Sequence, residues 1–315
     1  MKVQPINLGA ITVPNNIFLA PMAGYTDYAF RTLALMLGAG LCFTELTSAK
    51  GTVYKAGGTA ELLRCEKNDI PRTAAQLFGS DPYYIRAAAE SEELSAFEII
   101  DLNMGCPVPK IFKNGEGSAL LKDVLRAEAV VKAAVKSGKV VTVKIRTGLV
   151  HGDDIAAEYC KMAENAGAKL VTIHGRVRED YYSGEPDYAA IARAKSAVSI
   201  PIIANGGIFT AADAEKMIDK TGADGVMLAR GALENPLLIS ELTGNPPAMT
   251  KKEFIYRQIE LSVKEKGELR AAKEFRKFAP YYLKGLSNAK AAKIALSRAE
   301  SAAEITDIIN SVEGL

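Results

Sequence analysis

Cys106 is the residue whose type and setting point most directly to chemistry. Gly105 precedes it and Pro107 follows it, so its position is constrained on both sides. A thiol with a reference pKa of about 8.5 can donate a proton near neutral pH. Cys42 and Cys160 are interpreted instead as small buried hydrophobic residues. Cys106 is therefore the candidate general acid.

Two glycine-containing turns are candidates for holding a phosphate group. They consist of Asn205, Gly206 and Gly207, and of Ala229, Arg230 and Gly231. Glycines before a helix let backbone N–H groups approach phosphate oxygens, and an arginine adds a charged contact. Ordinary turn glycines are the alternative. Because both turns follow late strands of the fold expected below, phosphate binding is favoured.

A flat redox-active ring needs a backbone platform, an amide near its polar edge and a cation near the reduced ring. The platform is assigned to Pro21, Met22 and Ala23, the amide to Gln76 and the cation to Lys144. His174 would hydrogen-bond the ring or its phosphate, with a purely structural histidine as the alternative. A Schiff-base lysine of an aldolase is the rival for Lys144. That chemistry explains neither Gln76 nor the thiol.

These residues need elements that bring them together, and the sequence predicts a (β/α)₈ barrel. Short apolar runs alternate with amphipathic helical stretches, and no GxGxxG follows the first run. Eight such runs favour a closed barrel, in which all strand ends converge on one face. The expected strands are 17–20, 41–44, 73–77, 97–102, 140–145, 170–173, 202–204 and 225–228. The expected helices include 27–37, 82–94, 121–136, 154–165 and 211–220, and Gly38, Gly138, Gly167 and Gly222 mark helix ends.

The pattern changes after residue 243, where strands give way to helices. We expect a barrel domain over 1–243 and a small helical bundle over 244–315, with helices at 250–266, 270–286, 288–299 and 302–313. The second part carries 13 Lys and Arg against 9 Asp and Glu, although the whole chain has a net charge of only +2. A solvated helical face is the simplest interpretation of that excess.

Composition excludes several classes of protein. No apolar run approaches the roughly 20 residues of a membrane span, and the first residues lack a signal-peptide pattern. A cytoplasmic protein is therefore expected. The four cysteines have no metal-ligand spacing, so no metal is expected, and a monomer is the default oligomeric state.

Several motifs together resemble the bacterial tRNA-dihydrouridine synthases, most closely their B-type branch. The shared segments are 20–24 with Thr26 and Asp27, 101–107, 117–121, 143–148, 172–176 and 203–208. The segment Asn103-Met104-Gly105-Cys106-Pro107 is highly specific to this family, whereas the glycine turns occur in many barrels. The family commonly has aspartate where Gly207 stands here.

The resemblance implies an FMN- and NADPH-dependent oxidoreductase that reduces the C5=C6 bond of specific uridines in tRNA. NADPH would reduce the flavin, flavin N5 would pass hydride to C6, and Cys106 would protonate C5. FMN would contact Pro21, Met22, Ala23, Gln76, Lys144, His174, Asn205, Gly206, Gly207, Ala229 and Arg230. The tRNA-facing residues would be Asn103, Arg176 and Arg178 at the barrel, and Arg276, Lys277 and Lys284 in the basic, aromatic-rich part of the tail.

Two other functions remain open on the sequence alone. One is an FMN-dependent barrel dehydrogenase that acts on a free pyrimidine, which would have no need of a basic tail. The other is a non-catalytic RNA-binding barrel protein, which would have no need of Cys106.

Overall fold

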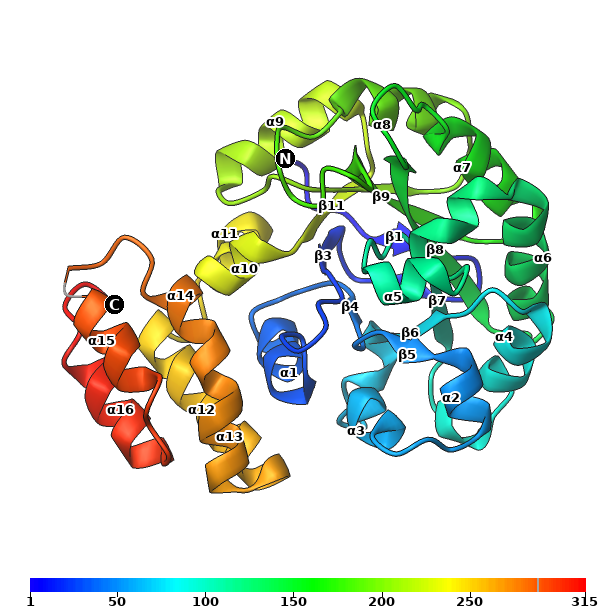
Figure 1. The fold of residues 1–315 in the computed structure, drawn as a ribbon. Helices are drawn as coiled ribbons and strands as arrows, with labels where there is room; N and C mark the ends of the chain where they lie inside the picture. The colour runs from blue at the N-terminus through cyan, green and yellow to red at the C-terminus, as the bar shows by residue number, and fades with distance from the viewer. Residues whose placement is uncertain (288) are drawn as a thin grey trace.

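The computed structural model describes residues 1–287 and 289–315, and its core is a barrel of eight parallel strands (Figure 1). The strands run in the order β3, β11, β10, β9, β8, β7, β6, β4. A parallel bridge between Phe18 and Leu41 joins the first to the last and closes the ring. The predicted (β/α)₈ barrel is therefore confirmed. The strands are β3 (Ile17–Leu19), β4 (Cys42–Phe43), β6 (Thr73–Phe78), β7 (Ile99–Met104), β8 (Val140–Gly148), β9 (Leu170–Val177), β10 (Ile202–Asn205) and β11 (Gly225–Leu228).

Three short strands were not anticipated. β5 (Thr47–Ser48) pairs in parallel with the carboxyl end of β6, and β1 (Ile6–Asn7) pairs with β2 (Thr12–Val13) as an antiparallel hairpin. The side chains of Ile6, Leu8 and Val13 are buried against Phe18 and Phe43 inside the barrel. The hairpin thus completes the apolar filling of the barrel interior.

Helices surround the barrel, one or more after each strand. They are α1 (Tyr28–Met36), α2 (Ala49–Val53), α3 (Thr59–Leu63), α4 (Pro82–Ala89), α5 (Pro109–Lys113), α6 (Val124–Val135), α7 (Ala156–Asn165), α8 (Tyr188–Ser196), α9 (Ala211–Thr221), α10 (Arg230–Glu234) and α11 (Leu238–Thr243). Short 3₁₀ turns cover Ile70–Arg72, Glu92–Leu94 and Gly117–Lys122. The four predicted helix-end glycines all have positive φ, as such ends require.

Two barrel helices are shorter than predicted. The helix expected over 121–136 begins at Val124, because the Asp123 side chain accepts a hydrogen bond from the Arg126 N–H and caps it there. The helix expected over 82–94 ends at Ala89 and is followed by the separate turn at Glu92–Leu94.

The tail after residue 243 is helical in its described part, as predicted. It consists of α12 (Lys251–Lys266), α13 (Glu268–Phe275), a 3₁₀ turn (Arg276–Phe278), α14 (Ala279–Tyr282), α15 (Ala289–Leu296) and α16 (Ala302–Asn310). The single helix expected over 270–286 is broken, because Pro280 lacks an N–H and clashes with a continuing helix. Residue 288, the first of the helix expected over 288–299, lies outside the described residues.

The tail packs against α1 of the barrel through aromatic and charged groups. Phe30 stacks on Phe278 at 6.0 Å between ring centroids and meets Phe254 edge-on at 5.4 Å. Beside them Lys266, only 5% exposed, pairs with Asp27 at 2.8 Å and with Glu274 at 2.9 Å. The rings and this buried ion cluster together hold the tail to the barrel. In the ribbon, α12 of the tail lies beside α1 (Figure 1).

The described part of the chain contains neither a membrane-spanning helix nor a cluster of metal-binding side chains. Among residues 1–287 and 289–315, no helix is both long and apolar enough to cross a membrane. The same residues include no group of three or more His, Cys, Asp or Glu side chains placed to hold a metal ion.

Candidate active site

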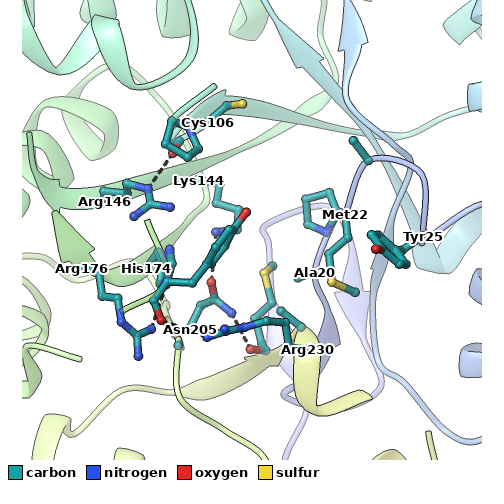
Figure 2. A pocket seen from close by; sticks show the side chains of 18 of the residues that line it. Ala20, Met22, Tyr25, Cys106, Lys144, Arg146, His174, Arg176, Asn205 and Arg230 are labelled. Carbon is teal, nitrogen blue, oxygen red and sulfur yellow. Dashed lines mark hydrogen bonds between the residues drawn. The ribbon is translucent and has the colours of Figure 1, made fainter. Parts of the chain in front are cut away.

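A cavity of about 520 Å³ opens at the carboxyl ends of the barrel strands, a size typical of ligand sites (Figure 2). Cys106 and Arg230 lie on opposite sides of it, with Lys144 and Asn205 between them. The residues assigned from sequence to the cofactor or to the reaction all line this cavity: Pro21, Met22, Ala23, Gln76, Cys106, Lys144, His174, Asn205, Gly206, Gly207, Ala229 and Arg230. Two residues assigned to tRNA, Asn103 and Arg176, line it as well.

The turn after β10 is shaped as a backbone cradle. Gly206 and Gly207 have φ of +120° and +69°, and a Cβ at Gly206 would lie 3.0 Å from the Arg176 guanidinium. A Cβ at Gly207 would lie 3.0 Å from Pro186. The close contact with Pro186 gives a local reason for glycine at a position where the resembling family commonly has aspartate. With Arg230 beside it, the turn suits an anionic group.

Lys144 is a half-buried cation in the middle of the cavity. Its Nζ donates to Oδ1 of Asn205 over 3.2 Å, and Nδ2 of Asn205 in turn donates to the Met227 carbonyl over 2.8 Å. Burial, followed by repulsion from Arg146, lowers the pKa of Lys144 to about 8. Its hydrogen-bond partner is a neutral amide, so the charge is available to stabilise negative charge on a bound group.

His174 on β9 is held as a neutral ring. Its pKa is lowered well below the usual value by burial and then by Arg146, Lys144, Arg176 and Arg230. The Arg176 guanidinium lies 3.2 Å from Nε2 of His174. Because arginine can only donate, Nε2 accepts and the ring proton lies on Nδ1.

The Cys106 loop is fixed by hydrogen bonds to its backbone. Oδ1 of Asn103 accepts from the N–H groups of Gly105 (3.1 Å) and Cys106 (2.8 Å), and the Ser118 hydroxyl donates to the Cys106 carbonyl at 2.8 Å. Burial raises the pKa of the Cys106 thiol above its ordinary value. The thiol is therefore protonated at neutral pH, which is the state that a proton donor needs.

Comparison with known proteins places this site in a family. The family model described as dihydrouridine synthase matches residues 18–313. The chain belongs to the dihydrouridine synthase family. It is 37% identical over 293 residues to a probable tRNA-dihydrouridine synthase from Rickettsia bellii, covering 90% of each chain. It is also 38% identical over 241 residues to the tRNA-dihydrouridine synthase B of Pseudomonas putida, covering 76% of this chain and 71% of that one.

The fold extends beyond close relatives. The histamine dehydrogenase from Rhizobium sp. 4-9 superposes with a TM-score of 0.57 over 82% of this chain and 50% of that one, at 16% identity. At this identity the likeness shows the fold alone. The family match, by contrast, includes the Cys106 loop and nearly all of the helical tail.

This dihydrouridine synthase has residues at its site that we did not assign from sequence. A strap, defined as residues 181–184, crosses the cavity edge with its carbonyls toward three arginines. Arg146 donates to the Tyr181 carbonyl at 3.0 Å, Arg230 to that of Tyr182 at 3.3 Å, and Arg176 to those of Ser183 at 2.8 Å and Gly184 at 2.6 Å. The arginine positions at strand ends were the available signal; the partner loop was not visible in the sequence.

Two tyrosines form the side of the cavity nearest the tail. Tyr25 follows β3, and Tyr281 comes from α14; both line the cavity. Their ring centroids are 5.5 Å apart and nearly perpendicular. Among the described cavity-lining residues, Tyr281 is the one that the tail supplies. Its spacing in the sequence gave no sign of this role.

The residues assigned from sequence to tRNA are dispersed. Arg176 on β9 is buried and hydrogen-bonded to the strap, and the Arg178 guanidinium lies 3.7 Å from the ring centroid of Phe112, outside the cavity. Arg276 donates to the Ala299 carbonyl at 2.8 Å, inside the tail. Lys284 pairs with Glu234 of α10 at 2.8 Å. Lys277 lies 5.9 Å from the ring centroid of Tyr25, near the cavity edge. The structure thus brings none of the three tail cations into the cavity.

Proposed function

We propose that this chain is a tRNA-dihydrouridine synthase that binds FMN, is reduced by NADPH and reduces the C5=C6 bond of uridines in tRNA. One observation carries the proposal. A protonated thiol, a half-buried lysine with a neutral partner and a glycine cradle beside an arginine all line one cavity. Membership of the dihydrouridine synthase family supports the same reaction.

The residues present fit a flavin mononucleotide. Gly206, Gly207 and Arg230 offer a cradle and a cation for the phosphate, and Pro21 to Ala23 offer a backbone platform in the same cavity. Lys144 would hold the negative charge of the reduced ring. When bound and reduced, the flavin supplies a hydride to C6 of the uracil ring.

The chain's own residues then complete the reduction. Cys106 gives its thiol proton to C5, so that hydride and proton together saturate the double bond, and the thiolate is reprotonated from solvent. Asn103 holds the backbone of Gly105 and Cys106 and thereby orients the thiol. Cys106 is the catalytic residue, and Asn103 is a positioning residue.

A uracil in folded tRNA is stacked and must be extruded to enter such a cavity. The Tyr25 and Tyr281 pair lies at the cavity side next to the tail, where the remainder of the tRNA would be bound. Lys277, beside Tyr25, is the tail cation placed best to meet a phosphate there.

The proposal is tested by optical spectroscopy on the purified protein. We expect it to bind FMN with a flavin absorption spectrum, to be bleached by NADPH without oxygen, and to be reoxidised by unmodified tRNA with formation of dihydrouridine. NADH and free uridine are the matched controls. The proposal would be overturned if the protein does not bind FMN, or if unmodified tRNA does not reoxidise its reduced form.

Substitution of the thiol tests its role separately. Cys106→Ala should retain the flavin and its reduction but lower the rate of dihydrouridine formation about 10²- to 10⁴-fold, the range of general acid catalysis. Cys160→Ala, a buried cysteine on α7, is the matched control and should keep the wild-type rate in the folded protein. An unchanged rate in Cys106→Ala would refute proton donation by this thiol.

A further inference from the structure

A fully buried carboxyl group lies behind the cavity and is not used in the mechanism above. Asp101 on β7 has no exposed surface. Its Oδ2 accepts from Nε2 of Gln76 on β6 at 2.7 Å, and its Oδ1 accepts from the Thr142 hydroxyl on β8 at 2.6 Å. Asp101 thus joins three neighbouring strands of the barrel, directly beneath two residues that line the cavity.

Hydrogen bonds continue from Asp101 to the thiol loop in one direction. Because Nε2 of Gln76 faces Asp101, its Oε1 faces away and accepts from Nδ2 of Asn103 at 3.0 Å. Oδ1 of Asn103 is then the atom that accepts from the backbone of Gly105 and Cys106. Each step therefore fixes the orientation of the next amide group.

The ionised carboxylate decides this direction. The oxygen and nitrogen of an amide side chain have nearly the same shape, so only its partners determine which way it points. An ionised carboxylate can only accept. A flipped Gln76 would set its oxygen against Asp101 and its NH₂ against that of Asn103, and a flipped Asn103 would set its NH₂ against two backbone N–H groups.

We propose that Asp101 is a positioning residue for the reaction: it sets the orientation of Gln76 and Asn103 and through them holds the Cys106 loop for proton transfer. The inference rests on the proposed function, since it concerns the proton-donating thiol. The hydrogen bonds of Asp101 reach the cavity through these two amides, so its main effect falls on the orientation of cavity groups and on the rate of the step that uses Cys106.

The charge state of Asp101 makes the arrangement sensitive to pH. Burial raises the pKa of Asp101 to about 6, against the opposing effects of Gln76, Thr142 and Lys144. Lys144 on β8 is the charged group that acts on it, and Lys144 is itself affected by Arg146 and Cys106. Above about pH 6 the carboxylate accepts from both neighbours. Below it, the protonated carboxyl can donate, and the amide direction is no longer fixed.

The first experiment measures single-turnover reoxidation of the reduced FMN-loaded enzyme by unmodified tRNA. Asp101→Ala removes the acceptor and should slow this step about 10- to 100-fold, the cost of a reacting group displaced by about 1 Å. Flavin reduction by NADPH should change less than threefold. Asp101→Asn keeps an oxygen for Gln76 and should recover much of the rate. In the wild type we expect the reoxidation rate to fall as the pH drops through about 6, the acidic limb of the pH–rate profile, and in Asp101→Asn this limb should be absent.

Thr142→Val provides the second variant, since Thr142 does not line the cavity. It removes one donor to Asp101 while leaving the Gln76 contact, so the rate at neutral pH should stay near wild type and the acidic limb should move to higher pH. This result can be obtained even if Asp101→Ala does not fold.

The outcomes separate the two proposals. A wild-type enzyme that makes no dihydrouridine contradicts the proposed function. With an active wild type, an unchanged step in Asp101→Ala, equal losses in the Ala and Asn variants, or an acidic limb that Thr142→Val does not shift would each overturn the role of Asp101.

Discussion

The cations of the barrel mouth differ in their partners from three cations of the helical tail. In the cavity, Lys144 donates to an amide and Arg146, Arg176 and Arg230 donate to backbone carbonyls. In the tail, Lys266 and Arg270 pair with carboxylates, as does Lys284. The first group therefore keeps its positive charge available for a ligand, whereas the second has much of its charge neutralised within the protein.

This difference separates two uses of basic residues. Carbonyl and amide partners position a cation without cancelling its charge, so the mouth attracts an anionic cofactor. Carboxylate partners from the barrel turn tail cations into links between the two parts, as Lys266 does with Asp27 and Lys284 with Glu234. Net charge along the sequence does not distinguish these uses.

The largest effect is expected at the buried link. Lys266→Met leaves Asp27 and Glu274 without their partner and should lower the free energy of unfolding by about 3–5 kcal/mol, measured by urea denaturation. Lys264→Met, an exposed position on the same helix, is the control. Burial lowers the pKa of Lys266, but Asp27 and Glu274 act in the opposite direction and their effect is larger. The pKa therefore lies above its ordinary value and Lys266 stays charged. A loss below about 1 kcal/mol would show that this cluster does not hold the tail.

Arg230 tests the other side of the comparison. Arg230→Ala removes a cation whose present partner is a carbonyl, and the Kd for FMN should rise about 10- to 100-fold, as for loss of a charged hydrogen bond. Fluorescence quenching of FMN on binding measures this. Arg230→Lys should recover part of the affinity. Equal affinity for FMN in the wild type and Arg230→Ala would show that Arg230 does not contact the phosphate.

The affinity for reduced FMN should also depend on the charge of Lys144. Its pKa is lowered to about 8 by burial and by Arg146, so it is mostly charged at pH 7 and loses its proton as the pH rises through about 8. Affinity should then fall by up to about tenfold per pH unit above that value, since one pKa unit corresponds to a factor of ten. In Lys144→Met this fall should be absent; a persisting fall would assign it to another group.

The smallest effect is expected at Lys284, which is 60% exposed and paired with Glu234. Lys284→Ala should change the free energy of unfolding by less than about 1 kcal/mol and leave the Kd for FMN unaltered. If Lys284 is engaged by Glu234, the salt dependence of tRNA binding should also be unaltered. If the slope of log affinity for tRNA against log salt concentration were smaller by about one in Lys284→Ala, Lys284 would instead be a phosphate contact.

Much of the barrel and its cavity could be predicted from the sequence because both follow from local patterns. Buried parallel strands are continuous apolar runs, and glycines with positive φ mark helix ends. Once the strands are placed, topology brings their carboxyl ends together, so Gln76, Lys144 and Asn205 had to meet although they are far apart in sequence.

What the sequence missed depends on partners that only the folded chain supplies. Arg276 was assigned to RNA because it lies in a basic, aromatic segment, but a carbonyl 23 residues away takes its guanidinium. Asp101 was seen only as part of a motif, since its role depends on Gln76 and Thr142 from neighbouring strands. Pro280 is a local signal for a helix break, which the prediction of one long helix overlooked.

The position of Tyr281 has a consequence for protein engineering and for divergence within the family. A side chain from α14 lines the cavity of a barrel that is otherwise complete by residue 243. Grafting the tail of one relative onto the barrel of another would therefore import a new cavity wall together with the surface that we propose meets the tRNA. Chimeras designed to redirect the enzyme to another tRNA should carry the Tyr25 and Tyr281 pair as one unit, because exchanging either alone separates two rings that pack together.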